Sequence, residues 1–573
     1  AKYAERPLWG TKKDGVWNWT TYGEFHALVD KFRGGLASLG VGKGDRVAII
    51  SDNRVEWAVA AYATYGLEAE FVPMYQAQMA KEWKFILDDC AAKVVIAAND
   101  TIYDALVAMK PELSTLVHVI GLERAAGEPM SYAGLLEVGA KTPVPVRSPD
   151  PKSISGFIYT SGTTGKPKGV MLSHENIASN ITGVHEVFTF EPDDRSLSFL
   201  PWAHSYGQTA EVHGLLSMGC SVAINDDLQN LIPNLAEVKP TILLAVPRIF
   251  NRIYDGVTKQ IEARPGFLQA IIRGGIQGAI KRAHGEKVGA IEALELAFDE
   301  RAIFAKIREK FGGRLKYAIS ASATLSKDVG DFIDAIGLTV YEGYGLTETS
   351  PIVSANFPGH RRLGSVGKVI PGVRVMIDTT VGTHPLQGEI IVYGPNVMVG
   401  YHNRPEENAA ALMKDGGFRT GDLGYVDEDG FLYITGRIKE LYKLENGKYV
   451  MPSPLEEELK LSPYIANVMI YGDGKPSNVA LIVVSEEAVR KWAESESVTL
   501  GTDLTKDEKV RGLIASEIEH HSKDFKGFEK PKDFVLITED FTTQNGMLTP
   551  TLKLKRRDVL AKYDNQIHAL YKK

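Results

Sequence analysis

Short apolar runs alternate with longer amphipathic segments along most of the first 340 residues. Residues 46–51 (RVAIIS) and 70–75 (EFVPMY) are short, mostly apolar runs, as is typical of buried strands. Residues 55–67, between them, have the length and apolar content of a helix. Thr21 and Glu24 stand at capping-box spacing ahead of apolar residues at helical intervals, so a helix is expected to begin there. Further strands are expected at 93–100, 221–226, 242–247 and 315–320. The alternation predicts α/β layers with mostly parallel sheets.

The pattern changes near residue 374, where short strands and turns replace the alternation and predict a small β-rich subdomain over about 374–436. Residues 263–310 are rich in Ala, Arg, Lys and Glu and predict a helical insertion. Because 573 residues are too many for one hydrophobic core, we expect two domains. These are a large N-terminal domain (1–436) of layered α/β subdomains and a small α+β C-terminal domain (437–573).

Composition narrows the class of protein. The formal net charge of −7 argues against a general nucleic-acid binder. Cys90 and Cys220 lie far apart and form no metal or disulfide pattern, so a reducing, cytoplasmic compartment is expected. No apolar stretch is long enough to span a bilayer. Peripheral membrane contact stays open, as do oligomeric state and a signal removed before Ala1.

Residues 159–169, YTSGTTGKPKG, form the most unusual loop of the chain. The apolar runs on either side, 156–160 and 169–173, read as strands, so the loop joins two ordered elements and is not a linker. Glycines, hydroxyls and two lysines in such a loop suit a polyphosphate. The Walker pattern does not fit, since Pro167 stands where it requires glycine.

Four motifs in register extend this interpretation. The glycine loop, YEGYGLTET (341–349), RTGDLG (419–424) and ITGRIKEL (434–441) resemble the motifs of the acyl-adenylate-forming enzymes, in the same order and spacing. Among these, LPWAHSYGQ, VPRIFNRIYDGV, KLENGKYVMPSPLEEEL and LTPTLKLKRR look like long-chain fatty acyl-CoA synthetases. The resemblance covers nearly the whole chain.

The resemblance implies that the glycine loop closes over the β- and γ-phosphates of ATP. The residues concerned are Thr160, Ser161, Gly162, Thr163, Thr164, Gly165, Lys166 and Lys168. Hydroxyl and amide donors together with two ammonium groups suit a polyanion.

In the second motif, the resemblance implies that Gly343 and Tyr344 pack on adenine and that Thr347 binds phosphate. It makes Glu348 a ligand of Mg²⁺, a hard cation for which one carboxylate plus phosphate oxygens suffices. Taken alone, Glu348 would be read as a solvated surface residue.

The later motifs supply the remaining nucleotide contacts that the resemblance implies. Asp422 would accept hydrogen bonds from both ribose hydroxyls. Arg437 would contact ribose and phosphate, and Ile434 would pack beside the nucleotide. Lys439 occupies the hinge position.

The C-terminal basic run carries the lysine that, by resemblance, bridges the attacking carboxylate and the α-phosphate. Spacing from Thr549 indicates Lys553, with Lys555 as the rival. Without the other motifs, a terminal lysine-rich run would be read as solvated.

The acyl side of the predicted site rests on fewer signals. His204 fits the family's position beside the acyl carboxylate, although a lone histidine is more often structural. Trp202 and Tyr206 are candidate walls of an acyl pocket and could equally be core residues. Gly447 and Lys448 lie where a coenzyme A channel is expected.

The implied reaction is ATP-dependent activation of a medium- or long-chain fatty acid to acyl-AMP, followed by transfer to coenzyme A. An acyl-ACP synthetase, acting on acyl carrier protein, shares these motifs and remains the first alternative. A non-catalytic acyl or nucleotide sensor is the second, and its sign would be loss of Glu348 or of the terminal lysine. Luciferase-like oxidation is disfavoured by the long-chain motifs.

Overall fold

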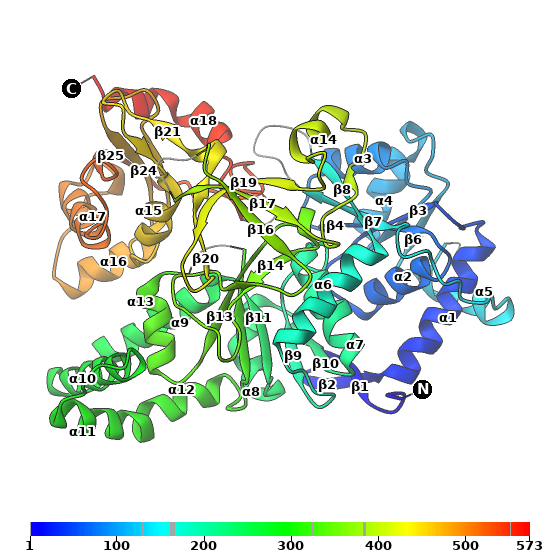
Figure 1. The fold of residues 1–573 in the computed structure, drawn as a ribbon, viewed down its shortest axis with the longest axis horizontal. Coiled ribbons are helices and arrows are strands. Elements are labelled where there is room, and N and C mark those ends of the chain that lie inside the picture. Colours follow the sequence, from blue (N-terminus) through cyan, green and yellow to red (C-terminus); the bar gives the residue numbers. More distant parts are fainter. Residues whose placement is uncertain are drawn as a thin grey trace.

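The computed structural model describes residues 2–128, 130–160, 167–322, 325–381, 386–549 and 552–572. It consists of two large α/β layers, a small β-rich unit and a C-terminal domain (Figure 1). The predicted fold class is confirmed. Among the described residues, no helix is both long and apolar enough to cross a bilayer.

The first sheet has the strand order β18-β8-β7-β4-β3-β5-β6. Its members are β3 (Arg46–Ile50), β4 (Glu70–Met74), β5 (Val94–Ala97), β6 (His118–Gly121), β7 (Ile154–Thr160), β8 (Lys168–Ser173) and β18 (Gly400–Tyr401). The central strands are parallel, whereas β7, β8 and β18 pair antiparallel at one edge. The glycine loop therefore connects the two strands of a hairpin.

The second sheet has the order β15-β14-β13-β12-β11-β9-β10-β1-β2 and is also parallel in its centre. Its members are β1 (Pro7–Lys13), β2 (Val16–Thr21), β9 (Arg195–Ser198), β10 (Ser221–Ile224), β11 (Ile242–Ala245), β12 (Tyr317–Ser320), β13 (Val340–Gly345), β14 (Ile352–Ala355) and β15 (Lys368–Val369). The apolar runs expected at 221–226, 242–247 and 315–320 are its buried strands β10, β11 and β12.

Helices cover both sheets and follow from local signals. Helix α1 (Tyr22–Ser38) begins at the capping box that Thr21 and Glu24 form, and it buries Phe25, Phe32 and Leu36. The other helices are α2 (Val55–Tyr65), α3 (Ala80–Asp89), α4 (Asp100–Met109), α5 (Tyr132–Lys141), α6 (His174–Val187), η2 (Gly207–Leu215), α7 (Leu216–Met218), α8 (Leu231–Val238), α9 (Pro247–Glu262) and α13 (Lys327–Ala335). The predicted insertion consists of α10 (Gly266–Ala283), α11 (Ala290–Asp299), η4 (Glu300–Phe304) and α12 (Ala305–Lys310).

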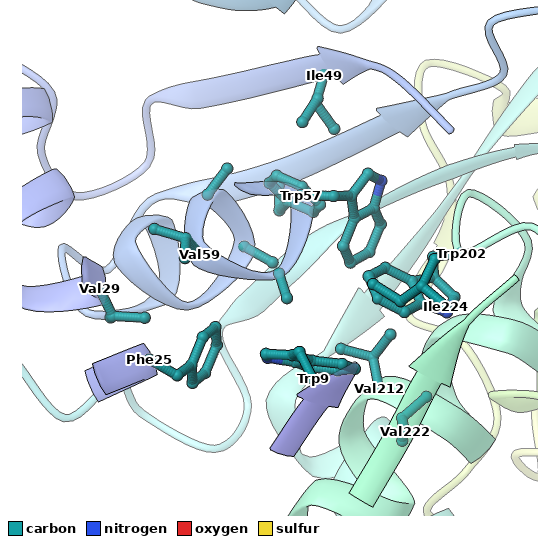
Figure 2. Close-up of a cluster of buried hydrophobic side chains, with 14 of the residues drawn as sticks. Trp9, Phe25, Val29, Ile49, Trp57, Val59, Trp202, Val212, Val222 and Ile224 are labelled. Atoms are coloured by element: carbon teal, nitrogen blue, oxygen red, sulfur yellow. The ribbon is translucent and has the colours of Figure 1, made fainter. Parts of the chain in front are cut away.

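The largest core lies where the two sheets meet. Trp202 is fully buried there, with its ring centroid 5.0 Å from that of Trp9 and 5.6 Å from that of Trp57 (Figure 2). Phe25 of α1 packs edge-on against Trp9. Such aromatic pairs bury large areas, so they fix the relative position of the two sheets.

The rest of the chain forms two smaller units. An antiparallel sheet contains β16 (Arg374–Asp378), β17 (Gly388–Tyr393), β19 (Phe418–Val426) and β20 (Leu432–Arg437), with α14 (Pro405–Ala411) beside it. The C-terminal domain contains β21 (Tyr442–Lys443), β22 (Tyr449–Val450), α15 (Pro452–Leu459), β23 (Ile465–Tyr471), β24 (Asn478–Val484), α16 (Glu486–Ser495), α17 (Glu508–His521), β25 (Pro531–Ile537) and α18 (Arg556–Ala569). It has hydrophobic clusters of its own on the two faces of its sheet.

Candidate active site

The glycine loop joins β7 to β8 at the end of their hairpin. Thr160 and Lys168 are paired residues at this end, and the predicted residues Ser161 to Lys166 lie outside the described residues. The Lys168 ammonium lies 5.1 Å from the ring centroid of Tyr401 and 3.6 Å from Glu407 Oε1. The hairpin therefore directs a cation toward the aromatic ring of the neighbouring strand β18.

Tyr401 connects this hairpin to Glu348. Its hydroxyl donates a hydrogen bond of 2.8 Å to Glu348 Oε1, and Oε2 has no partner among the described residues. Burial, then the charge of Glu348, raises the pKa of Tyr401, so the tyrosine stays a neutral donor. Glu348 thus has one fixed and one available oxygen.

Those oxygens determine which metal site could form. Within the described ranges, no group of three His, Cys, Asp or Glu side chains is arranged to hold a metal ion. A site for Zn²⁺ built from protein ligands is therefore not indicated there. One available carboxylate oxygen fits Mg²⁺, which takes most of its ligands from phosphate and water.

The segment after β13, which carries Thr347 and Glu348, is also hydrogen-bonded to the segment that carries His204. Thr347, in the short helix η5 (Thr347–Thr349), shares a hydrogen bond of 3.1 Å with the hydroxyl of Ser205. Because Ser205 follows His204 directly, this bond fixes the predicted phosphate ligand beside the predicted acyl position.

Asp422 is the centre of a second cluster, on β19. Tyr344 O–H donates to its Oδ2 at 2.7 Å, and Arg437 Nε donates to its Oδ1 at 2.8 Å. Asp422 is 3 % exposed, and burial raises its pKa in spite of the Arg437 charge. Each carboxylate oxygen can accept a second hydrogen bond, so two ribose hydroxyls can be accommodated.

The two other residues predicted to contact the nucleotide, Gly343 and Ile434, lie on the strands that carry Tyr344 and Arg437. Gly343, on β13, pairs with Ala355, and Ile434, on β20, pairs with Gly424. Ile434 packs against the hydrophobic cluster of the small antiparallel sheet, as does Tyr344. Their contacts with a nucleotide stay predictions.

Lys553 brings the C-terminal domain into this site. A turn holds it, because its N–H donates to Thr549 Oγ1 at 3.0 Å and its carbonyl accepts from the Thr549 N–H at 2.8 Å. Part of Lys553 is exposed, yet desolvation of its ammonium and then the charge of Arg437 lower its pKa. Asp422 and Glu348 act in the opposite direction.

The two lysines of the basic run have different surroundings. Lys553 lies within electrostatic range of His204 and Asp422. Lys555 instead precedes α18, and its N–H donates to Met547 O. The geometry therefore favours Lys553 over its rival, and its catalytic role stays a prediction.

His204 is a neutral hydrogen-bond donor in this arrangement. Its Nδ1 accepts a hydrogen bond of 3.2 Å from the Tyr206 N–H, which leaves the ring proton on Nε2. Burial, followed by the charge of Lys553, lowers the pKa of His204 to about 4. An Nε2–H group next to a lysine suits a carboxylate oxygen of a substrate.

The two predicted walls of the acyl pocket lie in the hydrophobic core. Trp202 Nε1 donates to Ser198 Oγ at 2.9 Å, and that hydroxyl donates to the buried Glu211. Tyr206 is 6 % exposed and donates to the carbonyl of Ile319 at 3.2 Å. For Trp202 this placement favours the core alternative, and contact of either side chain with an acyl chain stays a prediction.

The hinge and channel residues lie apart from this cluster. Lys439 is exposed in the short helix η6 (Ile438–Glu440), directly after β20. Gly447 and Lys448 form the tip between β21 and β22, with the Lys448 ammonium 4.6 Å from the Phe528 ring centroid. No described contact joins the tip to Asp422 or His204.

Sequence reasoning missed three contributors to the site, which are Tyr401, Ser205 and Glu440. Tyr401 arrives through the pairing of β18 with β8, and Glu440 lies close enough to raise the pKa of Lys553. The hydroxyl of Ser205 stands inside the motif around His204 and could have been singled out. Glu440 lies inside ITGRIKEL (434–441) and could have been singled out in the same way, whereas Tyr401 carries no comparable local signal.

Comparisons with known proteins agree with this architecture. Residues 2–402 match the family described as AMP-binding enzyme, and residues 440–573 match the AMP-binding enzyme C-terminal domain. The long-chain-fatty-acid–CoA ligase FadD15 of Mycobacterium tuberculosis is 35 % identical over 98 % of this chain and 93 % of its own. Long chain acyl-CoA synthetase 7 (peroxisomal) of Arabidopsis thaliana is 33 % identical over 99 % of this chain and 84 % of its own.

Solved structures share the fold at lower identity. The adenylation domain of a carboxylate reductase from Mycobacterium chelonae superposes with a TM-score of 0.77 at 23 % identity, covering 100 % of this chain and 90 % of that one. An anthranilate CoA ligase in complex with anthranoyl-AMP gives 0.75 at 19 % identity, with coverage of 99 % and 95 %.

Proposed function

The chain belongs to the AMP-binding enzymes and, among them, to the long-chain acyl-CoA synthetases, and from this premise we propose the reaction and the residues that carry it. The enzyme activates a fatty acid with ATP to acyl-AMP and pyrophosphate. It then transfers the acyl group to coenzyme A and releases AMP.

One observation supports the first half-reaction most strongly, namely the convergence of charged groups from both domains. Lys553 of the C-terminal domain lies within electrostatic range of Asp422, Glu348 and His204 of the N-terminal domain. A cation within range of both the expected ribose ligand and the expected carboxylate ligand can stabilise the negative charge that develops during adenylation. Stabilising that charge with preorganised groups is the main source of acceleration in such reactions.

The roles of the residues follow from their contacts. The Nε2–H of His204 orients one oxygen of the fatty carboxylate, and Lys553 attracts the other toward the α-phosphate. Asp422, held by Tyr344 and Arg437, receives the ribose hydroxyls. The carboxylate oxygen then attacks phosphorus, and the bond to pyrophosphate breaks.

The phosphates of ATP are held at the opposite end of the site. Thr160 and Lys168 are paired at the end of the β7–β8 hairpin and would contact the tail of the nucleotide. Glu348 would hold Mg²⁺ there, and the metal would supply positive charge against the β- and γ-phosphates. Tyr401 keeps the Glu348 carboxylate in one orientation for this purpose.

The second half-reaction needs a different arrangement, in which the thiol of coenzyme A reaches the acyl carbon. We assign Lys439 as the hinge, because it is exposed and lies two residues after the last strand of the small antiparallel sheet. Rotation there would withdraw Lys553 and bring the tip with Gly447 and Lys448 to the site as one wall of a coenzyme A channel.

The test of the proposed function is formation of AMP with the acyl acceptor varied. AMP release should require a long-chain acid, ATP, Mg²⁺ and coenzyme A. The same assay with holo acyl carrier protein in place of coenzyme A should give little product. Acyl transfer to the carrier protein at an equal rate would make the chain an acyl-ACP synthetase, and no acid-dependent AMP release would favour a sensor.

A further inference from the structure

Helix α11, in the insertion, has its polarity reversed relative to an ordinary surface helix. Its large apolar side chains face solvent, with Ile291 73 % exposed, Leu294 74 % and Phe298 49 %. The alanines at 290, 293 and 297, which share that face, are exposed as well. We call these six residues the α11 apolar face. A soluble helix normally buries such a stripe.

The acidic residues of α11 point the other way, toward α10. Glycines of α10 allow this approach, because a Cβ atom on Gly274 or Gly275 would clash with Glu295 or Asp299. Asp299 is fully buried, and neither of its oxygens has a hydrogen-bond partner among the described residues. Burying an unpaired carboxyl is unfavourable, so this polar interior is not what an ordinary amphipathic surface helix would adopt.

The position of the hairpin limits what can cover the α11 apolar face. Figure 1 shows α10 and α11 projecting at the lower left of the molecule, with α11 on the outer side. The apolar face therefore lies on a protruding edge. A deformable surface can contact a protruding edge without a matching groove.

Charge around the hairpin indicates the nature of that surface. Residues 263–285 contain four Lys or Arg and no Asp or Glu, whereas the whole chain has a net charge of −7. Lys281 is paired with Glu292, whereas no ion pair joins Arg264, Arg273 or Arg282 to an acidic side chain that the structure describes. A basic flank beside an exposed apolar stripe is the combination by which amphipathic helices bind anionic membrane surfaces.

We propose that the α11 apolar face docks on an anionic lipid bilayer, with the cations of α10 contacting the lipid headgroups. The apolar side chains would enter the boundary between headgroups and acyl chains, while the rest of the protein stays outside. The benefit of docking rests on the proposed function, since a long-chain fatty acid partitions into the membrane. The docking itself does not depend on catalysis.

The test uses the full chain and vesicles without ATP or fatty acid. Binding is measured by co-sedimentation with phosphatidylcholine vesicles containing about 30 % phosphatidylglycerol. The triple variant Ile291→Glu, Leu294→Glu, Phe298→Glu should bind at least about tenfold more weakly, because three apolar side chains no longer enter the lipid. Arg273→Glu with Arg282→Glu should weaken binding to the anionic vesicles and leave binding to pure phosphatidylcholine unchanged.

A control places glutamates on exposed apolar residues elsewhere, with one charge fewer than the triple variant. Val16 and Leu228 are 62 % and 56 % exposed and lie outside the insertion, so Val16→Glu with Leu228→Glu should bind vesicles like the wild type. A second measurement uses Phe298→Trp, whose emission should shift to the blue when vesicles are added. AMP formation from a short soluble acid should be unchanged in all these variants, which separates failure of this proposal from failure of the proposed function.

Three results would overturn the proposal. The first is unchanged vesicle binding by the triple variant, and the second is equal loss in the control variant. The third is a wild-type dimer that the triple variant dissociates in sedimentation velocity, with vesicle binding unaffected, which would assign the α11 apolar face to a second copy of the chain.

Discussion

Removing the hydroxyl of Tyr401 tests whether the orientation of the Glu348 carboxylate matters for Mg²⁺ binding. Tyr401→Phe keeps the ring over which the Lys168 ammonium lies and deletes only the hydrogen bond of 2.8 Å to Glu348 Oε1. If Glu348 holds Mg²⁺, its carboxylate will then adopt several orientations, and the metal will bind more weakly.

The expected magnitude follows from the chemistry of that bond. A hydrogen bond to a charged group contributes about 1.5–3 kcal/mol, or roughly 10–150-fold in an equilibrium constant. Deleting a partner that orients a metal ligand typically costs about 10–100-fold in metal affinity. We therefore expect the apparent Mg²⁺ affinity to fall about tenfold, at the lower end, because Glu348 itself remains. Pyrophosphate release measured against free Mg²⁺ gives this value, and saturating Mg²⁺ should restore most of the rate.

Tyr393→Phe is a closely matched control. The Tyr393 hydroxyl also donates to a carboxylate, Asp415 Oδ2 at 3.0 Å, and a guanidinium lies 3.8 Å from its ring centroid, but it stands outside the site. That variant should keep the wild-type Mg²⁺ dependence. Equal Mg²⁺ dependence in the two variants, or a loss of rate in Tyr401→Phe that Mg²⁺ does not restore, would refute the assignment of Glu348.

Three further predictions concern the hinge, the acid and pH. Lys439→Pro removes a backbone donor and fixes φ near about −65°, so one half-reaction should fail while the other survives; equal loss of both in a folded protein would argue against rotation. The kcat/KM for saturated acids should rise to about twelve carbons or more, because each buried methylene contributes about 0.8 kcal/mol; a maximum for acetate, hexanoate or an aromatic acid would contradict this. Burial lowers the pKa of His213 from 6.5 to about 4. Between these two pKa values the unfolded chain binds a proton at His213 that the folded chain does not bind. The free energy of unfolding should therefore fall as the pH drops from 6.5 to about 4. Urea unfolding at several pH values should show a shallower fall for His213→Gln, and an identical slope would refute the assignment.

Local sequence signals predicted the fold well where they coincide with burial. Parallel strands covered on both faces need continuous apolar runs, so β5 (Val94–Ala97) could be recognised from residues 93–100. The start of α1 was predictable because Thr21 and Glu24 satisfy each other's backbone groups. Both signals lie within a few residues of the element they specify.

The parts of the site that depend on distant pairing could not be predicted in this way. Tyr401 reaches Glu348 only because β18 pairs with β8, and nothing near residue 401 indicates that pairing. Trp202 illustrates a second limit, because an aromatic side chain looks the same in a sequence whether it lines a pocket or fills a core. Its burial against Trp9 and Trp57 is a tertiary fact.

The turn at Thr549 gives Lys553 and Lys555 different surroundings. Lys553 and Lys555 are equivalent in charge and two residues apart, and spacing alone favoured one. The hydrogen bonds between Lys553 and Thr549 set the direction of the chain, after which Lys555 precedes a helix. The spacing from Thr549 that pointed to Lys553 is also the spacing across which Thr549 holds this turn.

The most direct test of the account is the effect of Lys553→Ala on the two half-reactions measured separately, with Lys555→Ala as the matched control. Pyrophosphate release from ATP and a long-chain acid should fall about 10²–10³-fold, because one preorganised cation is lost from the developing charge. Thioester formation from supplied acyl-AMP and coenzyme A should stay near the wild-type rate, and Lys555→Ala should retain both activities. A defect in Lys555→Ala with a normal Lys553→Ala, or equal loss of both half-reactions in Lys553→Ala, would contradict the account.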